Sequence, residues 1–183
     1  SLPVDKNDTT PPAPPRLARL PEATNKQELE ITGSTEDGAT VILTINDKEE
    51  EVTSDSEGKF FFSYPLKKGE NEISAKAKDA AGNESQKTPA STVLFDDEAP
   101  PLDISSPSDG SQFYGEKQRQ AVIKGTTETG VTLTINNRLV KVEEDGSFTF
   151  ATTLSEGSNS FNFKSTDKAE NQTEKTISLN FSP

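Results

Sequence analysis

The sequence predicts an all-β protein made of two tandem β-sandwich domains. Three observations lead to this prediction: apolar residues alternate with polar ones along short segments, turn signals recur about every eight to twelve residues, and the second half of the chain repeats the first at a spacing of roughly ninety residues. No long segment sustains the apolar period of about 3.6 residues that an amphipathic helix requires.

The alternation has a period of two, which predicts strands with one buried face. Short turn-forming pairs separate these segments, as expected for antiparallel sheets. The turn signals are Asp37-Gly38, Asn136-Asn137, Asp145-Gly146 and Glu156-Gly157. The alternating residues are Val41, Leu43 and Ile45, then Phe60 and Phe62, then Ile73, Ala75 and Ala77, and in the second half Val131, Leu133 and Ile135, then Phe148 and Phe150, then Phe161 and Phe163.

The internal repeat sets the domain boundaries. Five sequence blocks recur in the same order, and a Pro-rich opening precedes each copy. We therefore expect a linker over residues 1–10, one domain over 11–96 and a second over 97–183, with the boundary between Asp96 and Pro101. The matched blocks begin at Ile31 and Ile123, Leu43 and Leu133, Gly58 and Gly146, Leu66 and Leu154, and Asp79 and Asp167.

About seven short strands in roughly 90 residues is typical of a two-sheet sandwich of the immunoglobulin type. The motifs resemble bacterial immunoglobulin-like modules, which occur in tandem on surface adhesins, stalks and cell-wall enzymes. The resemblance implies an extracellular, cell-surface location and neighbouring immunoglobulin-like domains in the same polypeptide. The resemblance rests on three motifs: Asp8-Thr9-Thr10-Pro11-Pro12, the Leu-x-x-Gly-x-Asn stretches at 66–71 and 154–159, and Asp-x-Ala-Gly-Asn at 79–83. In the last motif the second copy has Glu170 in place of Gly.

Composition excludes several functions. With 19 basic and 31 acidic residues, the net charge of −12 disfavours binding to nucleic acid or to an anionic membrane. No apolar run approaches the length of a membrane span. The chain has no Met and no signal-like segment, so we expect a mature or excised piece of an exported protein.

Catalysis is not expected. The chain has no His and no Cys to serve as a base or thiolate, and no Cys for a disulfide. With no Trp and only Tyr64 and Tyr114, we expect no aromatic platform for a sugar ring. The prediction is a non-enzyme that requires no cofactor.

Calcium is the one ion that the sequence favours, because Ca²⁺ prefers carboxylate, amide and carbonyl oxygens. We expect the chain to enter each sandwich beside its acidic loops, so that a cation would fasten the linker to the domain. The alternative is that Asp79 and Asn83 only close a tight turn, with Gly82 or Asn171 in the left-handed conformation. The candidate ligands are Asp97, Glu98, Glu128, Asp167 and Asn171 in the second domain, and Asp8, Glu36, Asp37, Asp79 and Asn83 in the first.

Stalks that resemble this family also contain Lys–Asn isopeptide bonds, for which Lys124 and Asn180 are the candidate positions if the lysine is buried.

Three functions remain open. A spacer predicts a polar surface without a large pocket or apolar patch. An adhesive module predicts an exposed apolar cluster, here around Phe113 and Tyr114, and a host, cell or glycan ligand. Accessory domains of a cell-wall or carbohydrate-active enzyme would accompany a catalytic domain elsewhere in the protein.

Overall fold

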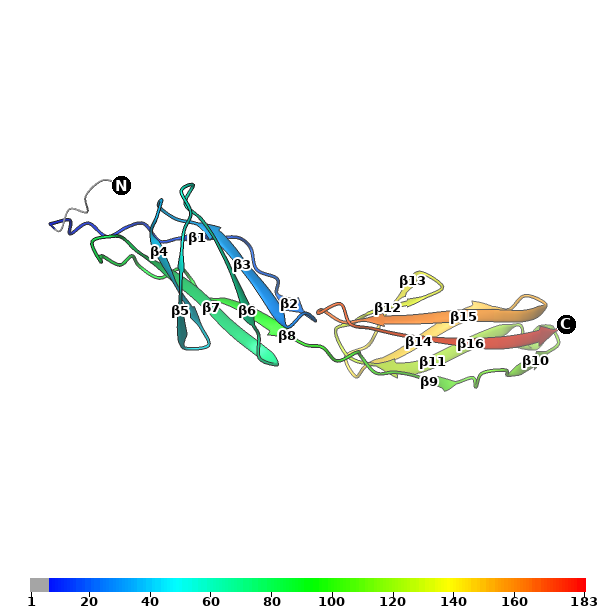
Figure 1. The fold of residues 1–183 in the computed structure, drawn as a ribbon. Helices are drawn as coiled ribbons and strands as arrows, with labels where there is room; N and C mark the ends of the chain where they lie inside the picture. The colour runs from blue at the N-terminus through cyan, green and yellow to red at the C-terminus, as the bar shows by residue number, and fades with distance from the viewer. Residues whose placement is uncertain (1–6) are drawn as a thin grey trace. The chain divides into compact units, whose positions relative to one another are not determined.

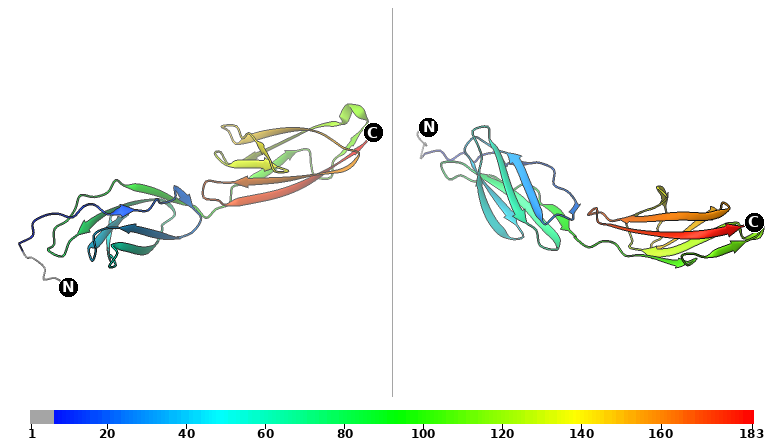
Figure 2. Two further views of the ribbon diagram at one scale, coloured as in Figure 1. Left: turned by 90° about the horizontal axis from the view of Figure 1, so that it is seen from above. Right: turned by 45° about the vertical axis from the view of Figure 1, so that its right-hand side comes forward.

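A computed structural model describes residues 7–183, and it confirms the all-β prediction. The chain divides between Asp97 and Glu98 into two compact units, called domain 1 and domain 2 below. Each is a sandwich of a three-stranded and a five-stranded sheet. Figures 1 and 2 show the layers of each domain.

Domain 1 contains eight strands within residues 7–97. The three-stranded sheet has the order β1-β3-β6, and the five-stranded sheet has the order β2-β8-β7-β4-β5. The strands are β1 (Arg16–Leu17), β2 (Ala23–Thr24), β3 (Glu28–Ser34), β4 (Thr40–Ile45), β5 (Lys48–Thr53), β6 (Lys59–Pro65), β7 (Gly69–Lys78) and β8 (Ser91–Phe95).

Domain 2 repeats this topology, with the sheet orders β14-β11-β9 and β10-β16-β15-β12-β13. A short 3-10 helix, η1 (Glu116–Gln118), precedes β11. The strands are β9 (Leu102–Ser106), β10 (Gln112–Tyr114), β11 (Gln120–Thr127), β12 (Thr132–Ile135), β13 (Arg138–Val140), β14 (Ser147–Thr153), β15 (Gly157–Thr166) and β16 (Gln172–Ser182).

The first segment of each domain contributes to both sheets. In domain 1, β1 pairs antiparallel with β3, and the chain then crosses to the other layer, where β2 runs parallel to β8. In domain 2, β9 pairs antiparallel with β11 and β10 runs parallel to β16. The incoming chain therefore joins the two layers of each sandwich.

Each domain has its own core between its two sheets. The alternating residues predicted to point inward are largely buried, and Val41, Leu43 and Ile45 are fully enclosed. Aromatic residues fill much of the core of domain 2, where the rings of Phe148 and Phe163 lie 6.1 Å apart. In both domains, the period of two thus places one face of each long strand in the core.

The repeated glycines Gly33 and Gly125 mark a close approach of the backbone to the core. A Cβ atom at Gly33 would collide with the carbonyl oxygen of Arg16 and lie 2.6 Å from Cζ of Phe60. At Gly125 it would meet the carbonyl oxygen of Asp103 and lie 2.5 Å from Cζ of Phe148. The repeated Gly and the repeated Phe therefore form one packing unit.

The repeated asparagine of the Leu-x-x-Gly-x-Asn motif closes the turn before β7 or β15. The Nδ2 atom of Asn71 donates to the carbonyl oxygens of Lys67 (2.8 Å) and Gly69 (3.0 Å), while its Oδ1 accepts from the Lys67 backbone N–H (3.1 Å). Asn159 makes the same contacts with Ser155 and Gly157. The motif is a structural element of both domains.

Candidate functional site

The predicted calcium residues of domain 1 gather around a tight turn after β7. Oδ1 of Asp79 accepts the backbone N–H of Asn83 at 2.8 Å, and Oδ2 accepts its Nδ2 at 2.9 Å. The Asn83 amide also donates to the backbone carbonyl of Asp8 at 2.9 Å. The turn is therefore fastened to the segment that leads into the domain.

The hydrogen bond from the Asn83 side chain is the main reason that the pKa of Asp79 is lowered, which keeps this carboxylate charged. Beside it lies an open pocket of about 240 Å³. Its polar lining brings together four predicted residues, Asp8, Glu36, Asp37 and Asp79.

Domain 2 builds the same turn after β15. Asp167 accepts the backbone N–H of Asn171 at 2.9 Å and its Nδ2 at 2.8 Å. The left-handed position is occupied by Glu170, with a φ of 71°, where domain 1 has Gly82 with a φ of 96°. The expectation that Asn171 adopts this conformation is therefore wrong, because the side chain of Asn171 instead closes the turn from the following position.

The chain leading into domain 2 is fixed by hydroxyl groups. Thr173 Oγ1 donates to the carbonyl of Pro100 at 2.6 Å, and Thr127 Oγ1 donates to that of Pro101 at 2.7 Å. Because the proton of Thr127 is used in this way, the buried Ser165 hydroxyl must donate to Thr127 Oγ1, 2.8 Å away. Pro100 and Pro101 thus lie at the end of the domain that carries the loop after β11 and the turn after β15.

The remaining predicted ligands lie near the boundary or in exposed loops. Asp97 forms an ion pair with Lys68 at 2.8 Å, and the hydrogen bond in this pair lowers the pKa of Asp97. Glu98 begins domain 2, and Glu128 is exposed just after β11. Within residues 7–183, no three carboxylates lie close enough together to form a metal site by themselves. Coordination by carboxylates, amides and carbonyls together stays a prediction.

The isopeptide hypothesis is wrong for the residues proposed. Lys124 is exposed on β11, whereas the bond requires a buried lysine. Asn180 lies on β16, in the opposite sheet of the sandwich. The side chain of Lys124 therefore points into solvent, away from the core.

The predicted adhesive cluster divides into two different environments. Phe113 is half-buried and packs against the core of domain 2, while Tyr114 is 64% exposed. Sequence reasoning missed Phe61, which is 57% exposed on the outer face of β6. The signal was available, because the middle residue of the run Phe60-Phe61-Phe62 must point away from the other two. In the part of the chain that the structure describes, no helix is long and apolar enough to cross a membrane.

Two family models divide the chain between them. Residues 21–97 match the bacterial Ig-like domain, and residues 100–182 match domain B of glucodextranase. Bacillopeptidase F of Bacillus subtilis is 31% identical over 163 residues, which cover 86% of this chain. The chain spans only 11% of the length of that relative.

Solved structures share the fold at low sequence identity. The fibronectin(III)-like modules of Clostridium thermocellum CbhA align with a TM-score of 0.55 and 14% identity, covering 95% of this chain and 92% of theirs. Three Ig domains of titin, I67–I69 in an E-to-A variant, align with a TM-score of 0.52 and 9% identity, covering 92% of this chain and 66% of theirs. Together with the two family matches, the repeated sandwich topology identifies the chain as a tandem pair of immunoglobulin-like domains, of which the first matches the bacterial Ig-like family.

Proposed function

We propose that the chain is a non-catalytic spacer segment of a bacterial protein exported to the cell surface, which holds other domains of that protein at a distance. The observation that carries this proposal is that each domain receives the chain at one end and releases it at the other. A series of such domains gains length with each repeat.

In domain 1, the incoming segment is held by Asn83, next to the C-terminal end of β7. The chain leaves through Phe95, which pairs with Gly69 at the opposite end of β7. The ten residues of β7 separate these ends by about 30 Å, at about 3.3 Å per residue step.

Domain 2 follows the same plan. Thr173 holds Pro100 at the start of β16, and that strand ends at Ser182, ten residues beyond its first residue. The hydroxyl and amide bonds to the incoming segment limit its freedom where it joins the sandwich. Such bonds favour a spacer in which each domain is fixed to the segment before it.

The spacer proposal can be tested by surface display. The chain is placed between a cell-wall anchor and a terminal epitope tag, and antibody binding to the tag is measured on cells with a thick capsule. We expect binding to fall when one domain is deleted and to be retained when both domains are replaced by an unrelated immunoglobulin pair of equal length. Loss of binding with that replacement would show that the sequence, rather than the length, matters.

The similarity to Bacillopeptidase F favours a second candidate, in which the pair is an accessory segment of a secreted enzyme. Antibodies against the chain would then precipitate peptidase activity from the culture medium. In a surface spacer they would instead detect the protein in the cell-wall fraction, and the precipitate would have no such activity.

A further inference from the structure

The outer face of the three-stranded sheet of domain 1 presents an aromatic ring to solvent. Phe60 is buried and Phe62 half-buried on the core side of β6, whereas Phe61 points outward and is 57% exposed. Its Cα partner on β3 is Thr32, whose side chain is too small to cover a phenyl ring. One flat apolar surface is therefore available on an otherwise polar face.

A pocket of about 590 Å³ lies on this face. Ser63, two residues beyond Phe61 on the same face of β6, lines the pocket together with its cross-strand partner Glu30. Phe61 is not part of the lining, but it is the diagonal neighbour of Glu30 across the strand pair. From such a position an aromatic side chain can reach a residue of the lining. The complete lining is Pro21, Thr24, Lys26, Glu28, Leu29, Glu30 and Ser63.

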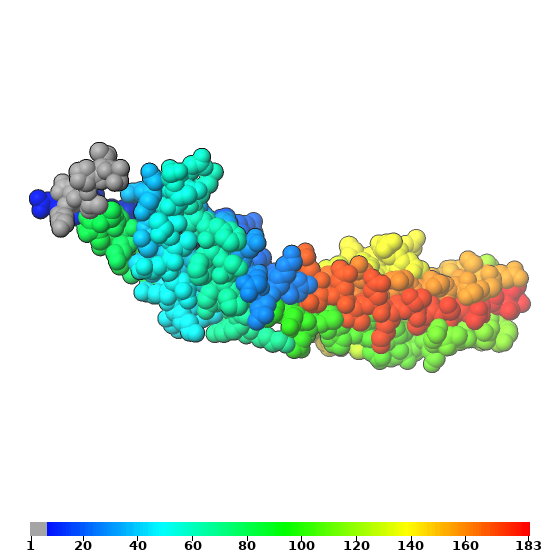
Figure 3. Space-filling view, in the orientation of Figure 1, coloured from blue at the N-terminus to red at the C-terminus, as the bar shows by residue number. Residues whose placement is uncertain are grey.

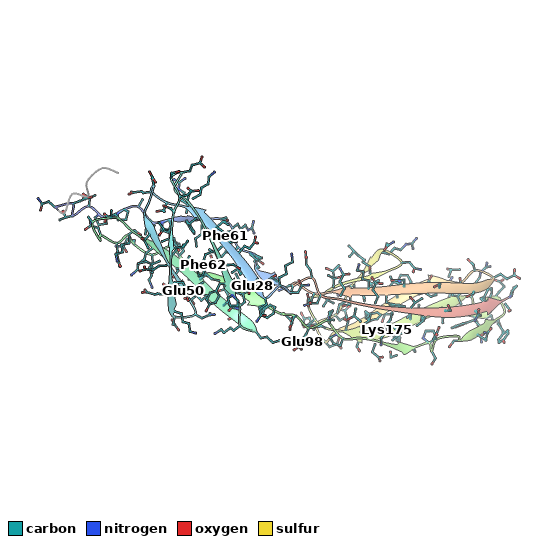
Figure 4. All side chains as sticks on the ribbon, viewed as in Figure 1. Glu28, Glu50, Phe61, Phe62, Glu98 and Lys175 are labelled. Atoms are coloured by element: carbon teal, nitrogen blue, oxygen red, sulfur yellow. The ribbon has the colours of Figure 1, made fainter. Side chains whose placement is uncertain are left out.

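The figures show how this face is assembled. In Figure 3 the blue segment that includes residues 21–30 lies directly beside the teal atoms of β6. Figure 4 labels Glu28 near the start of β3 and Phe61 farther along the same pair of strands. The segment before β3 and the outer faces of β3 and β6 therefore form the pocket together.

The polar groups of the pocket include both donors and acceptors. Glu28 Oε2 accepts the hydroxyl proton of Ser63 at 2.8 Å, which leaves its other carboxylate oxygen for a ligand. No residue of the described chain bonds the carboxylate of Glu30 or the ammonium group of Lys26. Thr24 adds a further hydroxyl. A ligand rich in hydroxyl groups matches this mixture, because each hydroxyl both donates and accepts.

Other ligand classes fit less well. The carboxylates of Glu28 and Glu30 would repel a phosphate or another anion. A basic peptide would meet Lys26 within the pocket. An apolar partner would bury these three charged groups without partners, at a high cost in free energy. A neutral sugar avoids all three penalties, and the C–H face of a pyranose ring can stack on Phe61.

We propose that this face of domain 1 binds a neutral glycan, with Phe61 as the stacking surface and Glu28, Glu30, Lys26 and Ser63 as hydrogen-bonding partners of the sugar hydroxyls. The proposal runs against the expectation that the chain has no aromatic platform for a sugar ring. It is independent of the spacer proposal, since a spacer needs no ligand.

Domain 2 supplies an internal control, because its equivalent face lacks the stacking ring. Thr149 stands at the position of Phe61, and Val122 at that of Glu30. Gln120 replaces Glu28 and already donates to Thr153 at 2.8 Å. Both domains therefore have an equivalent three-stranded sheet, but the proposed binding groups are present on this face in domain 1 and not in domain 2.

The test is native gel electrophoresis of the whole chain in gels that contain one neutral polysaccharide each: dextran, pullulan, hydroxyethylcellulose, laminarin or galactomannan. We expect at least one to retard the chain. Phe61→Ala should weaken that retardation at least about tenfold, as for the aromatic centre of a binding site, while Phe61→Tyr should preserve it. Thr149→Ala is the matched control and should change nothing.

Three results would overturn the proposal: retardation by none of the five polymers, equal retardation of Phe61→Ala, or a change in self-association in that variant instead, measured by sedimentation. The last result would identify the face as a contact between copies of the chain. In the display assay, Phe61→Ala should leave access to the epitope tag unchanged, so failure of the glycan proposal is distinguishable from failure of the spacer proposal.

Discussion

The two domains share one topology but protect the free edge of the five-stranded sheet in different ways. In domain 1 the edge strand β5 has six residues, and Glu50 lies opposite the core residue Leu43. In domain 2 the edge strand β13 has three residues, and Val140 lies opposite Leu133. An inward-facing charge and a short strand both discourage pairing with another chain. The repeat therefore preserves its turns and core, while each domain has its own solution at the edge.

The two domains also differ in how their buried polar side chains are hydrogen-bonded. Thr127 in domain 2 bonds both Pro101 and Ser165. At the equivalent position of domain 1, the buried hydroxyl of Thr35 has no partner in the described chain, and Ala77 stands where domain 2 has Ser165. Domain 1 instead has a hydrogen bond of 2.8 Å from Asn46 Nδ2 to Oδ1 of the fully buried Asn71. Domain 2 thus has a buried hydroxyl contact that domain 1 lacks, and domain 1 has an Asn46–Asn71 contact at its other end.

The largest effect expected is that of Asn71→Ala, because it removes a fully buried amide and leaves part-buried backbone groups of Lys67 and Gly69 without their partner. We expect domain 1 to lose about 3 kcal/mol of unfolding free energy, and Asn159→Ala to cost domain 2 about half as much, since Asn159 is only half-buried. Chemical denaturation gives the total, and hydrogen exchange with mass spectrometry on the whole chain assigns the loss to a domain. Equal losses in the two variants would refute the claim that Asn71 is the more important residue.

The next largest effect is expected at the equivalent threonines Thr127 and Thr35, where the same substitution should change the unfolding free energy in opposite directions. Thr127→Val leaves Pro101 and Ser165 unsatisfied and should destabilise domain 2 by about 2 kcal/mol. Thr35→Val removes a buried hydroxyl that lacks a partner and should stabilise domain 1 by about 1 kcal/mol. The same exchange experiment measures both, and destabilisation by Thr35→Val would show that this hydroxyl is bonded in solution.

These polar contacts mark the limit of what the sequence predicts. The alternation of apolar and polar residues identifies the strands and the residues that point inward. The sequence does not distinguish Thr35 from Thr127, because the difference arises from the residues that the fold brings opposite each hydroxyl.

The same limit applies to the functional sites. The loops that carry Asp37 and Asp79 were correctly expected at one end of domain 1, because the strand order of the sandwich fixes that end. The pocket beside Phe61 was not foreseen, since it depends on how the irregular segment at 21–27 folds against β3 and β6. Period-two patterns describe strands and carry no information about such a segment.

A smaller effect concerns the turn that follows β7 or β15. Glu170 adopts a φ of 71°, which costs about 1 kcal/mol for a residue other than glycine, so Glu170→Gly should stabilise domain 2 by at most that amount. Gly82→Ala, at the same place in domain 1, should destabilise by a similar amount. Thermal unfolding of both variants tests the difference in sign. Two shifts in the same direction would mean that the turn conformation does not control stability.

Calcium binding is expected to give the smallest effect. A dissociation constant near 1 mM, as in extracellular modules, would stabilise a domain by about 0.4 kcal/mol at 1 mM Ca²⁺, or raise its melting temperature by about 2 to 3 °C relative to excess chelator. Mg²⁺ is the ion control, because it requires a more rigid octahedral site. Asp37→Asn should abolish the shift in domain 1 without disturbing the turn that Asp79 closes.

At Asp97, the last residue of domain 1 and a predicted ligand of the second calcium site, Asp97→Ala should imitate chelation. Because Asp97 also pairs with Lys68, the matched control is Lys68→Ala, which removes the ion pair and keeps the carboxylate as a ligand. A calcium response that survives in Lys68→Ala and disappears in Asp97→Ala would assign Asp97 as a ligand of the ion. If neither domain responds, the hydrogen bonds to Asn83 and Asn171 are the whole role of the repeated aspartates, and the stability of each domain rests on packing and turns.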